Sequence, residues 1–225
     1  MDTTYPWIRI EQNILTCPDG HRVKLHAYSI SPELAPQIVV LGGLLSETEC
    51  DDLVSLSGAR LQPAMAADLC SSTPSHRPAE TVEHAHFARA ENDVIAKIEA
   101  RIATLSQWPA ADAYGLRVTR YREGRDLATY GGAVDLKDTA PDADAQDARR
   151  PIATVVMYLN DAPTAGEISF AQTGLSVCAH KGNALFFNYP DLGETADGHG
   201  TLGGLSIPAG ETWIATKWLA RNQHE

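Results

Sequence analysis

The spacing of apolar residues along the chain changes near residue 110. Within residues 91–106 the apolar positions recur every three or four residues, which is the period of one face of an α-helix. We therefore predict an amphipathic helix there, which ends before Pro109 because proline cannot continue it. The positions that carry this period are Val94, Ile95, Ile98, Ile102 and Leu105.

An earlier helix is predicted from its N-terminal signal. Ser46 and Glu49 match a capping box, in which the serine caps the helix and the glutamate bonds back to it. We expect this helix to reach about Ser57, with Gly58 ending it. Residues 62–90 hold three prolines and many small residues without a clear period, so we predict a long loop there with room for one strand.

Beyond residue 110 the pattern becomes that of β-strands. Residues 116–121 alternate between apolar and polar side chains, which is typical of a half-buried strand. Residues 152–159 are apolar and rich in β-branched side chains, which is typical of a buried strand. Shorter candidates, separated by Gly, Pro, Asn and Asp, lie near Ile168 and Val177 and at 184–188, 205–207 and 213–219.

This order of elements defines the expected fold class. Helices come first and many short strands follow, which favours a mainly β protein with helices packed on one face of a sandwich or barrel. At 225 residues the chain fits one domain, residues 1–225. Within it we expect residues 1–110 to supply N-terminal strands and supporting helices, and residues 111–220 to form the β core.

Charge and composition restrict the classes of function. A formal net charge of -11 without a basic patch argues against nucleic acid as a partner. No apolar run is long enough to span a membrane, and the first ten residues do not resemble a signal peptide. The four cysteines form no CxxC pair, which argues against a zinc site or a disulfide framework. We therefore expect a cytoplasmic protein that binds neither nucleic acid nor a membrane.

Five segments together resemble the prolyl-4-hydroxylase branch of the iron(II)/2-oxoglutarate oxygenases. Residues 45–53 resemble the early helix of that family, and residues 150–161 its "T-x-x-x-Y-L-N-D" strand. Residues 165–170 and 177–187 resemble its "G-G-x-T-x-F" and "V-x-P-x-x-G-x-A-L-x-F" segments. Residues 210–219 resemble its closing "G-x-K-W-x-x-x-K-W" strand. The resemblance implies a double-stranded β-helix, the cupin-like jelly roll, with the active site at its open end.

The resemblance also implies a site, and the sequence departs from it. The family holds iron with His-x-Asp and a distant histidine, and a Lys or Arg pairs with the far carboxylate of 2-oxoglutarate. One alignment keeps Asp135, but no histidine lies between His86 and His180 to complete His-x-Asp. Leu202 stands at the position of the distant histidine and Thr212 at that of the basic residue. We therefore expect no cofactor, with iron(II) and 2-oxoglutarate bound only if unusual ligands replace the lost ones.

Several residues remain candidates for chemistry in such a jelly roll. Tyr130, Asp135 and His199 are the candidate catalytic groups, and Asp135 with His199 would be the ligands if a metal binds. Arg117 and Arg120 face opposite sides of their strand, so at most one points inward, where it would replace the lost basic residue. The residues expected to contact the substrate are Arg117, Tyr121, Thr154, Leu202 and Thr212.

Tyr121 matches a family position that contacts the 2-oxoglutarate carboxylate, so it could hold a carboxylate here. His84 and His86 resemble a metal-binding pair, but they lie outside the segments that match the family's ligands. We expect them on a surface loop.

Three hypotheses for the function follow. The first is a repurposed, metal-independent enzyme that acts by acid/base chemistry on a small amino-acid-like or carbonyl metabolite. The second is a non-catalytic binding protein, in which the former active site only holds a ligand. The third is a true iron(II)/2-oxoglutarate hydroxylase with Asp135 and His199 as unusual ligands. The loss of the histidines favours the first.

Overall fold

The computed structural model describes residues 6–29, 37–63, 82–122, 125–126, 151–161, 167–170, 175–178, 180–188, 205–207 and 211–220. The helices within these ranges are α1 (Glu47–Gly58), α2 (Asp93–Ser106) and the short 3-10 helix η2 (Ala110–Asp112). Neither of the two α-helices is long and apolar enough to cross a membrane. The strands of the first half are β1 (Ile14–Thr16), β2 (Arg22–Ser29), β3 (Ile38–Gly42), β4 (Gln62–Pro63), β5 (Val82–Phe87) and β6 (Ala113–Arg122). Those of the second half are β7 (Arg125–Asp126), β8 (Pro151–Tyr158), β9 (Glu167–Phe170), β10 (Leu175–Val177), β11 (Ala184–Asn188), β12 (Leu205–Ile207) and β13 (Glu211–Ala220).

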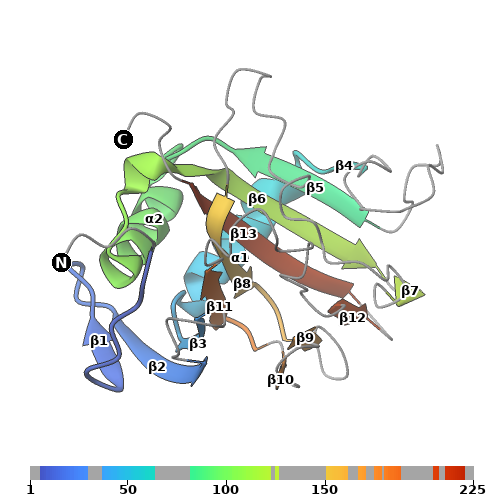
Figure 1. The fold of residues 1–225 in the computed structure, drawn as a ribbon. Helices are drawn as coiled ribbons and strands as arrows, with labels where there is room; N and C mark the ends of the chain where they lie inside the picture. The colour runs from blue at the N-terminus through green and yellow to red at the C-terminus, as the bar shows by residue number, and fades with distance from the viewer. Residues whose placement is uncertain are drawn as a thin grey trace.

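These strands form two antiparallel sheets. The large sheet has nine strands in the order β1-β2-β3-β11-β8-β13-β6-β5-β4, and the small sheet has four in the order β10-β9-β12-β7. Apart from β9 and β10, which pair with each other in the small sheet, consecutive strands of the second half alternate between the two sheets, as in a double-stranded β-helix. Figure 1 shows β13 running through the middle of the large sheet, with β7, β9, β10 and β12 grouped apart from α2. The predicted mainly β, jelly-roll fold with packed helices is therefore confirmed.

Two apolar cores lie on opposite faces of the large sheet. On the outer face, Ile95, Ile98 and Ile102 of α2 pack in one cluster with Leu53 of α1 and with strand residues such as Val118. On the other face, side chains of β8, β11 and β13 pack with residues of the small sheet. This second cluster includes Tyr158, Phe187, Ile214, Trp218, Ile168 and Val177. The face that packs against the small sheet is called the inner face below.

Helix α1 begins where the sequence predicts it, and α2 begins two residues later than predicted. Ser46 caps α1, accepting from the Glu49 N–H at 3.2 Å, while the Glu49 carboxylate accepts from the Ser46 N–H at 2.8 Å. This reciprocal pair is the predicted capping box. In α2 the cap is Asn92, so the helix begins two residues later than the apolar period suggested. It ends at Ser106 because Gln107 takes a left-handed conformation, before Pro109 is reached.

The region expected to be a long loop carries more structure than predicted. Within residues 62–90 the structure shows two strands, β4 and β5, which pair with each other. β5 also pairs along its whole length with β6. His84 and His86 therefore lie on a strand of the large sheet, and their placement on a surface loop was wrong. Tertiary pairing decides this segment, because its own sequence alternates too weakly to indicate a strand.

β13 is held to the outer helix layer by a buried ion pair. Lys217 lies on the outer face of β13, where its ammonium group donates to Glu99 of α2 and to the backbone carbonyl of Tyr114. Both side chains are almost fully buried. Burial lowers the pKa of Lys217 against the opposing effect of Glu99. A buried ammonium needs such partners, because an unpaired charge in the interior costs several kcal/mol.

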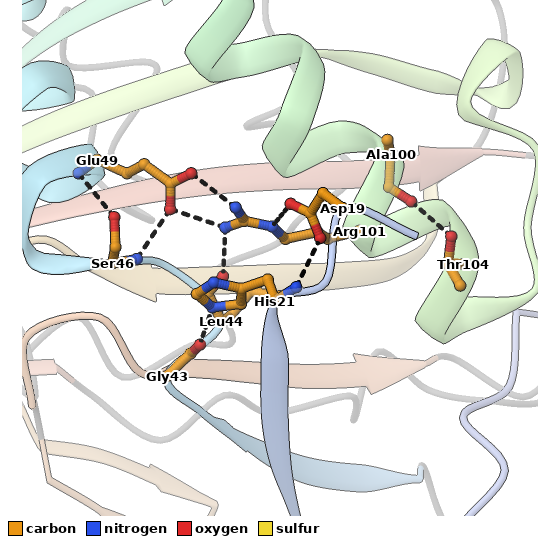
Figure 2. Close-up of polar contacts among 9 residues, drawn as sticks. All are labelled: Asp19, His21, Gly43, Leu44, Ser46, Glu49, Ala100, Arg101 and Thr104. Carbon is orange, nitrogen blue, oxygen red and sulfur yellow. Dashed lines mark hydrogen bonds and ion pairs between the residues drawn. The ribbon is translucent and has the colours of Figure 1, made fainter. Parts of the chain in front are cut away.

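A second polar cluster joins the β1–β2 turn to both helices. Arg101 of α2 donates two hydrogen bonds to the Glu49 carboxylate, at 2.7 and 2.8 Å, and one to Asp19 at 2.6 Å. It also donates to the Leu44 carbonyl at 3.0 Å. Figure 2 shows the guanidinium between the two carboxylates, with Ser46 on the far side of Glu49. One buried cation thus fixes the start of α1, the turn and the middle of α2 relative to one another.

We expect Arg101→Met to lower the free energy of unfolding by about 3 kcal/mol, because it leaves two partly buried carboxylates without their cation. Chemical denaturation at neutral pH would measure this. The matched control is Arg60→Met, which breaks a more exposed pair with Glu91 and should cost less than about 1 kcal/mol. Equal losses in the two variants would contradict the central role of Arg101.

The same cluster predicts how stability depends on pH. Burial alone would raise the pKa of Glu49, but the bonds from Arg101 and Ser46 outweigh it and hold that pKa below its ordinary value of 4.5. A carboxyl group with a depressed folded-state pKa stabilises the protein above its unfolded pKa and loses that contribution as the pH falls. Wild-type unfolding free energy should therefore fall below pH 4.5, and the fall should be smaller in R101M. Denaturation curves of both proteins between pH 3 and 7 would test this; parallel curves would contradict it.

Candidate functional site

Four of the residues expected to contact the substrate lie together on the inner face of the large sheet. In the antiparallel pairing of β6 with β13, Tyr121 lies opposite Thr212. In the pairing of β8 with β13, Thr154 lies opposite Trp218. Arg117 is four residues before Tyr121 on β6, so both point to the same side of the strand. The register of three neighbouring strands therefore brings these side chains onto one surface.

Arg117 is the inward-pointing arginine of β6. Its side chain is buried, and its guanidinium lies over the Trp218 ring, 4.7 Å from the ring centroid. Arg120 points to the outer face, where it stacks on Trp213 and forms an ion pair with Glu83. The prediction that at most one of the two faces inward is confirmed. A cation–π contact of this kind restrains the guanidinium while leaving its charge near the inner face.

Tyr121 is a protonated hydrogen-bond donor at any physiological pH. Burial raises the pKa of its phenol to about 12, although the Arg117 charge and a hydrogen bond with Thr119 both oppose the rise. A protonated phenol can donate to a carboxylate without bringing a second negative charge. The chemistry of this position therefore matches the carboxylate contact that the family pattern implies.

Several polar atoms of the inner face are buried without a hydrogen-bond partner in the described part of the chain. They are the Tyr158 hydroxyl, the Thr212 hydroxyl, the Trp218 indole N–H and Nε2 of His84. Burying such a group unsatisfied costs about 1–3 kcal/mol, so native proteins seldom keep several close together without a reason. Three of the four atoms can donate a hydrogen bond whatever the tautomer of His84. A ligand that offers several acceptor oxygens would satisfy them.

His84 is a functional candidate that the sequence did not reveal. Its Nδ1 lies 3.1 Å from the Thr119 hydroxyl, on the inner face of β5. Burial, together with the neighbouring charges of Arg117 and His86, lowers the pKa of His84 to about 3. The imidazole is therefore neutral. The only signal in the sequence was the spacing of His84 and His86, which places both on one side of a strand.

The other predicted groups lie outside the described residues. They are Tyr130, Asp135, His199 and Leu202. Within the described ranges no three His, Cys, Asp or Glu side chains come together in a metal-binding group. The ligands Asp135 and His199 therefore stay a prediction.

One hollow of the described surface lies away from this face. It has a volume of about 380 Å³ and is lined by Asp52 and Leu56 of α1 and by residues at the start of α2. Both helices pack on the outer face, so this hollow is separate from the inner-face residues. Its lining is largely acidic or exposed and offers no donor cluster comparable to that of the inner face.

Comparison with known proteins identifies relatives across most of the chain. No family model matches it. "Probable prolyl 4-hydroxylase 7" of Arabidopsis thaliana is 25% identical over 202 residues, which cover 82% of this chain and 62% of that protein. "Prolyl 4-hydroxylase 1" of the same organism is 28% identical over 212 residues, covering 85% of this chain and 72% of that protein. The chain thus spans less than two thirds of the first relative and somewhat more of the second.

Solved structures support the fold. The viral collagen prolyl hydroxylase of Paramecium Bursaria Chlorella virus-1, as a 2-oxoglutarate complex, matches with a TM-score of 0.56 and 20% identity. The match covers 83% of this chain and 96% of that one. A truncated form of the same viral enzyme matches with a TM-score of 0.51. At this level of identity the likeness shows the fold.

These relatives correct one expectation and confirm another. The expectation that the chain needs no cofactor is contradicted by its sequence relatives, which are named prolyl 4-hydroxylases. That expectation arose because each motif position was judged separately, so that every missing histidine or basic residue was taken as a lost cofactor contact. The family assignment made from five short segments is confirmed. The chain is similar in sequence to prolyl 4-hydroxylases, at 25% and 28% identity in the two relatives above, and shares the fold of the viral enzyme.

Proposed function

We propose that this protein is an iron(II)- and 2-oxoglutarate-dependent oxygenase that hydroxylates a peptidyl or amino-acid-like substrate. The observation that supports this most is the cluster of buried donors on the inner face, beside Tyr121 and Arg117. The relatives named prolyl 4-hydroxylases support the class of reaction and of substrate. Metal-independent acid/base chemistry is not retained.

The described residues fit 2-oxoglutarate, which carries two carboxylates. On the inner face of β6, β8 and β13 the described polar side chains are hydroxyls, an indole and a guanidinium, with no Asp or Glu among them. In the family pattern the basic residue would stand at 212, where this chain has threonine. We assign its role to Arg117, which lies on the neighbouring strand and faces the same side. A guanidinium can bind a carboxylate through two parallel hydrogen bonds.

The metal would be held by Asp135 and His199, the ligands that the sequence leaves available. Bound iron(II) and 2-oxoglutarate together supply oxygen activation, in which O₂ hydroxylates a C–H bond while 2-oxoglutarate becomes succinate and CO₂. The residues of the inner face bind the 2-oxoglutarate. Tyr121, Thr212 and Arg117 bind and orient the carboxylate, and the apolar residues Ile214 and Trp218 exclude water from it.

Anaerobic addition of iron(II) and 2-oxoglutarate to the metal-free protein should produce the visible charge-transfer band of an iron–2-oxoglutarate complex. Asp135→Ala and His199→Ala should each abolish it, because each removes one of few ligands. His180→Ala is the matched control, since His180 is an exposed histidine paired with Asp161 and should leave the band unchanged. Absence of both the band and succinate formation in the wild type would overturn the proposal.

The unpaired hydroxyl of Thr212 gives a second prediction. Thr212→Val removes a buried group without a partner, so the ligand-free protein should keep its stability or gain up to about 1 kcal/mol. Thr119→Val is the matched control, because its equally buried hydroxyl is bonded to His84 and its loss should cost about 1 kcal/mol. Chemical denaturation of both variants would show the opposite signs.

Bound 2-oxoglutarate should make the Thr212 hydroxyl stabilising, whereas it is neutral or destabilising in the ligand-free protein. If its hydroxyl binds the carboxylate, saturating 2-oxoglutarate with manganese(II) should raise the Tm of the wild type more than that of T212V. The comparison needs only thermal denaturation with and without 2-oxoglutarate. An equal rise in both proteins would remove Thr212 from the proposed carboxylate site.

A further inference from the structure

Three side chains of the inner face form a row that ends at Tyr121. His84 of β5 lies opposite Thr119 of β6 in the strand register, and its Nδ1 is 3.1 Å from the Thr119 hydroxyl. The Thr119 hydroxyl also lies within hydrogen-bonding reach of the Tyr121 phenol. The first two residues are buried, so water does not compete for these bonds. The row therefore connects β5 to the carboxylate contact.

Each member of this row has one proton to give. The neutral imidazole of His84 carries a single N–H, on Nδ1 or on Nε2. The Thr119 and Tyr121 hydroxyls carry one proton each. Because the threonine oxygen can accept two hydrogen bonds, three arrangements are possible. His84 donates to Thr119 and Thr119 to Tyr121; or Tyr121 donates to Thr119 and Thr119 to His84; or both His84 and Tyr121 donate to Thr119.

These arrangements present different chemistry to a ligand. When His84 Nδ1–H donates to Thr119 and Thr119 donates to Tyr121, the phenol proton is free to point outward, and Nε2 is a bare acceptor. In the other two arrangements the phenol proton is used inside the protein, and Nε2 carries the imidazole proton only where Thr119 donates to His84. An anion beside Tyr121 is stabilised only by the first arrangement, because only there does the phenol donate to it.

We propose that His84 is a positioning residue that, through Thr119, directs the Tyr121 hydroxyl proton toward a bound carboxylate and so leaves its own Nε2 as an acceptor for an N–H or O–H group of a second ligand. This inference rests on the proposed function, which supplies the carboxylate as 2-oxoglutarate. Nε2 of His84 is buried and lacks a hydrogen-bond partner in the described part of the chain, as an acceptor kept for a ligand would be. The low pKa of His84 supports the neutral state that the row requires. Binding of 2-oxoglutarate would thus prepare the acceptor that the substrate meets.

Affinity for 2-oxoglutarate, measured by calorimetry on the manganese(II)-loaded full chain, tests the row without relying on turnover. We expect His84→Leu, Thr119→Val and Tyr121→Phe each to weaken binding about tenfold, because each breaks the path that delivers a donor to a charged acceptor. Adding H84L or T119V to Y121F should have no further effect, since the end of the row is already absent. His84→Asn should restore most of the affinity, because its side-chain amide can donate from nearly the place of Nδ1.

The matched control is His86→Gln, which changes the other histidine of β5, two residues away and exposed. It should leave the affinity unchanged. Nitrogen-15 NMR of the labelled histidines gives a second readout that a purely structural role would not produce. In the 2-oxoglutarate complex, His84 should carry its proton on Nδ1, and T119V should remove that preference.

The outcomes separate the two proposals. A wild-type protein that binds no 2-oxoglutarate would overturn both the proposed function and this inference. Normal wild-type binding with unchanged affinity in H84L and T119V would overturn this inference alone, as would a proton on Nε2 in the complex. If H84L fails to fold, T119V and H84N decide the matter, because they keep the packing of the row nearly intact.

Discussion

The buried ion pair between Lys217 and Glu99 fixes the orientation of β13, and the inner face depends on that orientation. Every residue of β13 after Glu211 is buried. Burial alone therefore does not determine which side chains of β13 face the helices and which face the small sheet. Successive side chains of a strand alternate, and a slip of one residue would exchange the two faces completely. Lys217 finds a carboxylate only on the helix side, because Glu99 lies in α2. Because Lys217 points to the helices, the alternation along the strand places four side chains on the inner face: Thr212, Ile214, Thr216 and Trp218.

The inner face is less stable than it could be, and the outer face offsets this. Buried hydroxyl, indole and imidazole groups without partners would be replaced by apolar residues if stability alone were selected. Among the residues that the structure describes, no buried side-chain polar atom of the outer face lacks a hydrogen-bond partner. Arg101 meets two carboxylates and a carbonyl, and Lys217 meets Glu99. The asymmetry between a satisfied outer face and an unsatisfied inner face is itself an argument that the inner face binds something polar.

Local pattern predicted the elements whose neighbours agree with it. The capping box of α1, the apolar period of α2 and the β-branched run of β8 all appear where the sequence indicated them. β5 was missed because its histidines and glutamate made it look like a solvated loop. Its burial comes from pairing with β6, which follows it after a helix and is not visible in a short window. The Arg101 cluster was missed for the same reason, because its carboxylates are 52 and 82 residues away along the chain.

The candidate site shows why comparison by single positions misjudged the cofactor. Thr212 stands where the family pattern has a basic residue, and the sequence therefore suggested that the carboxylate contact was lost. In an antiparallel sheet, however, a charge need not come from one strand. Arg117 reaches the same face from β6, whose register with β13 places Tyr121 directly opposite Thr212. When one face of a sheet binds a ligand, a neighbouring strand can supply the charged group while the other contacts with the ligand keep their positions. Under the proposed function, replacement of one lysine or arginine by threonine at 212 is then a relocation of charge within the sheet, and the motif alone could not distinguish this from loss.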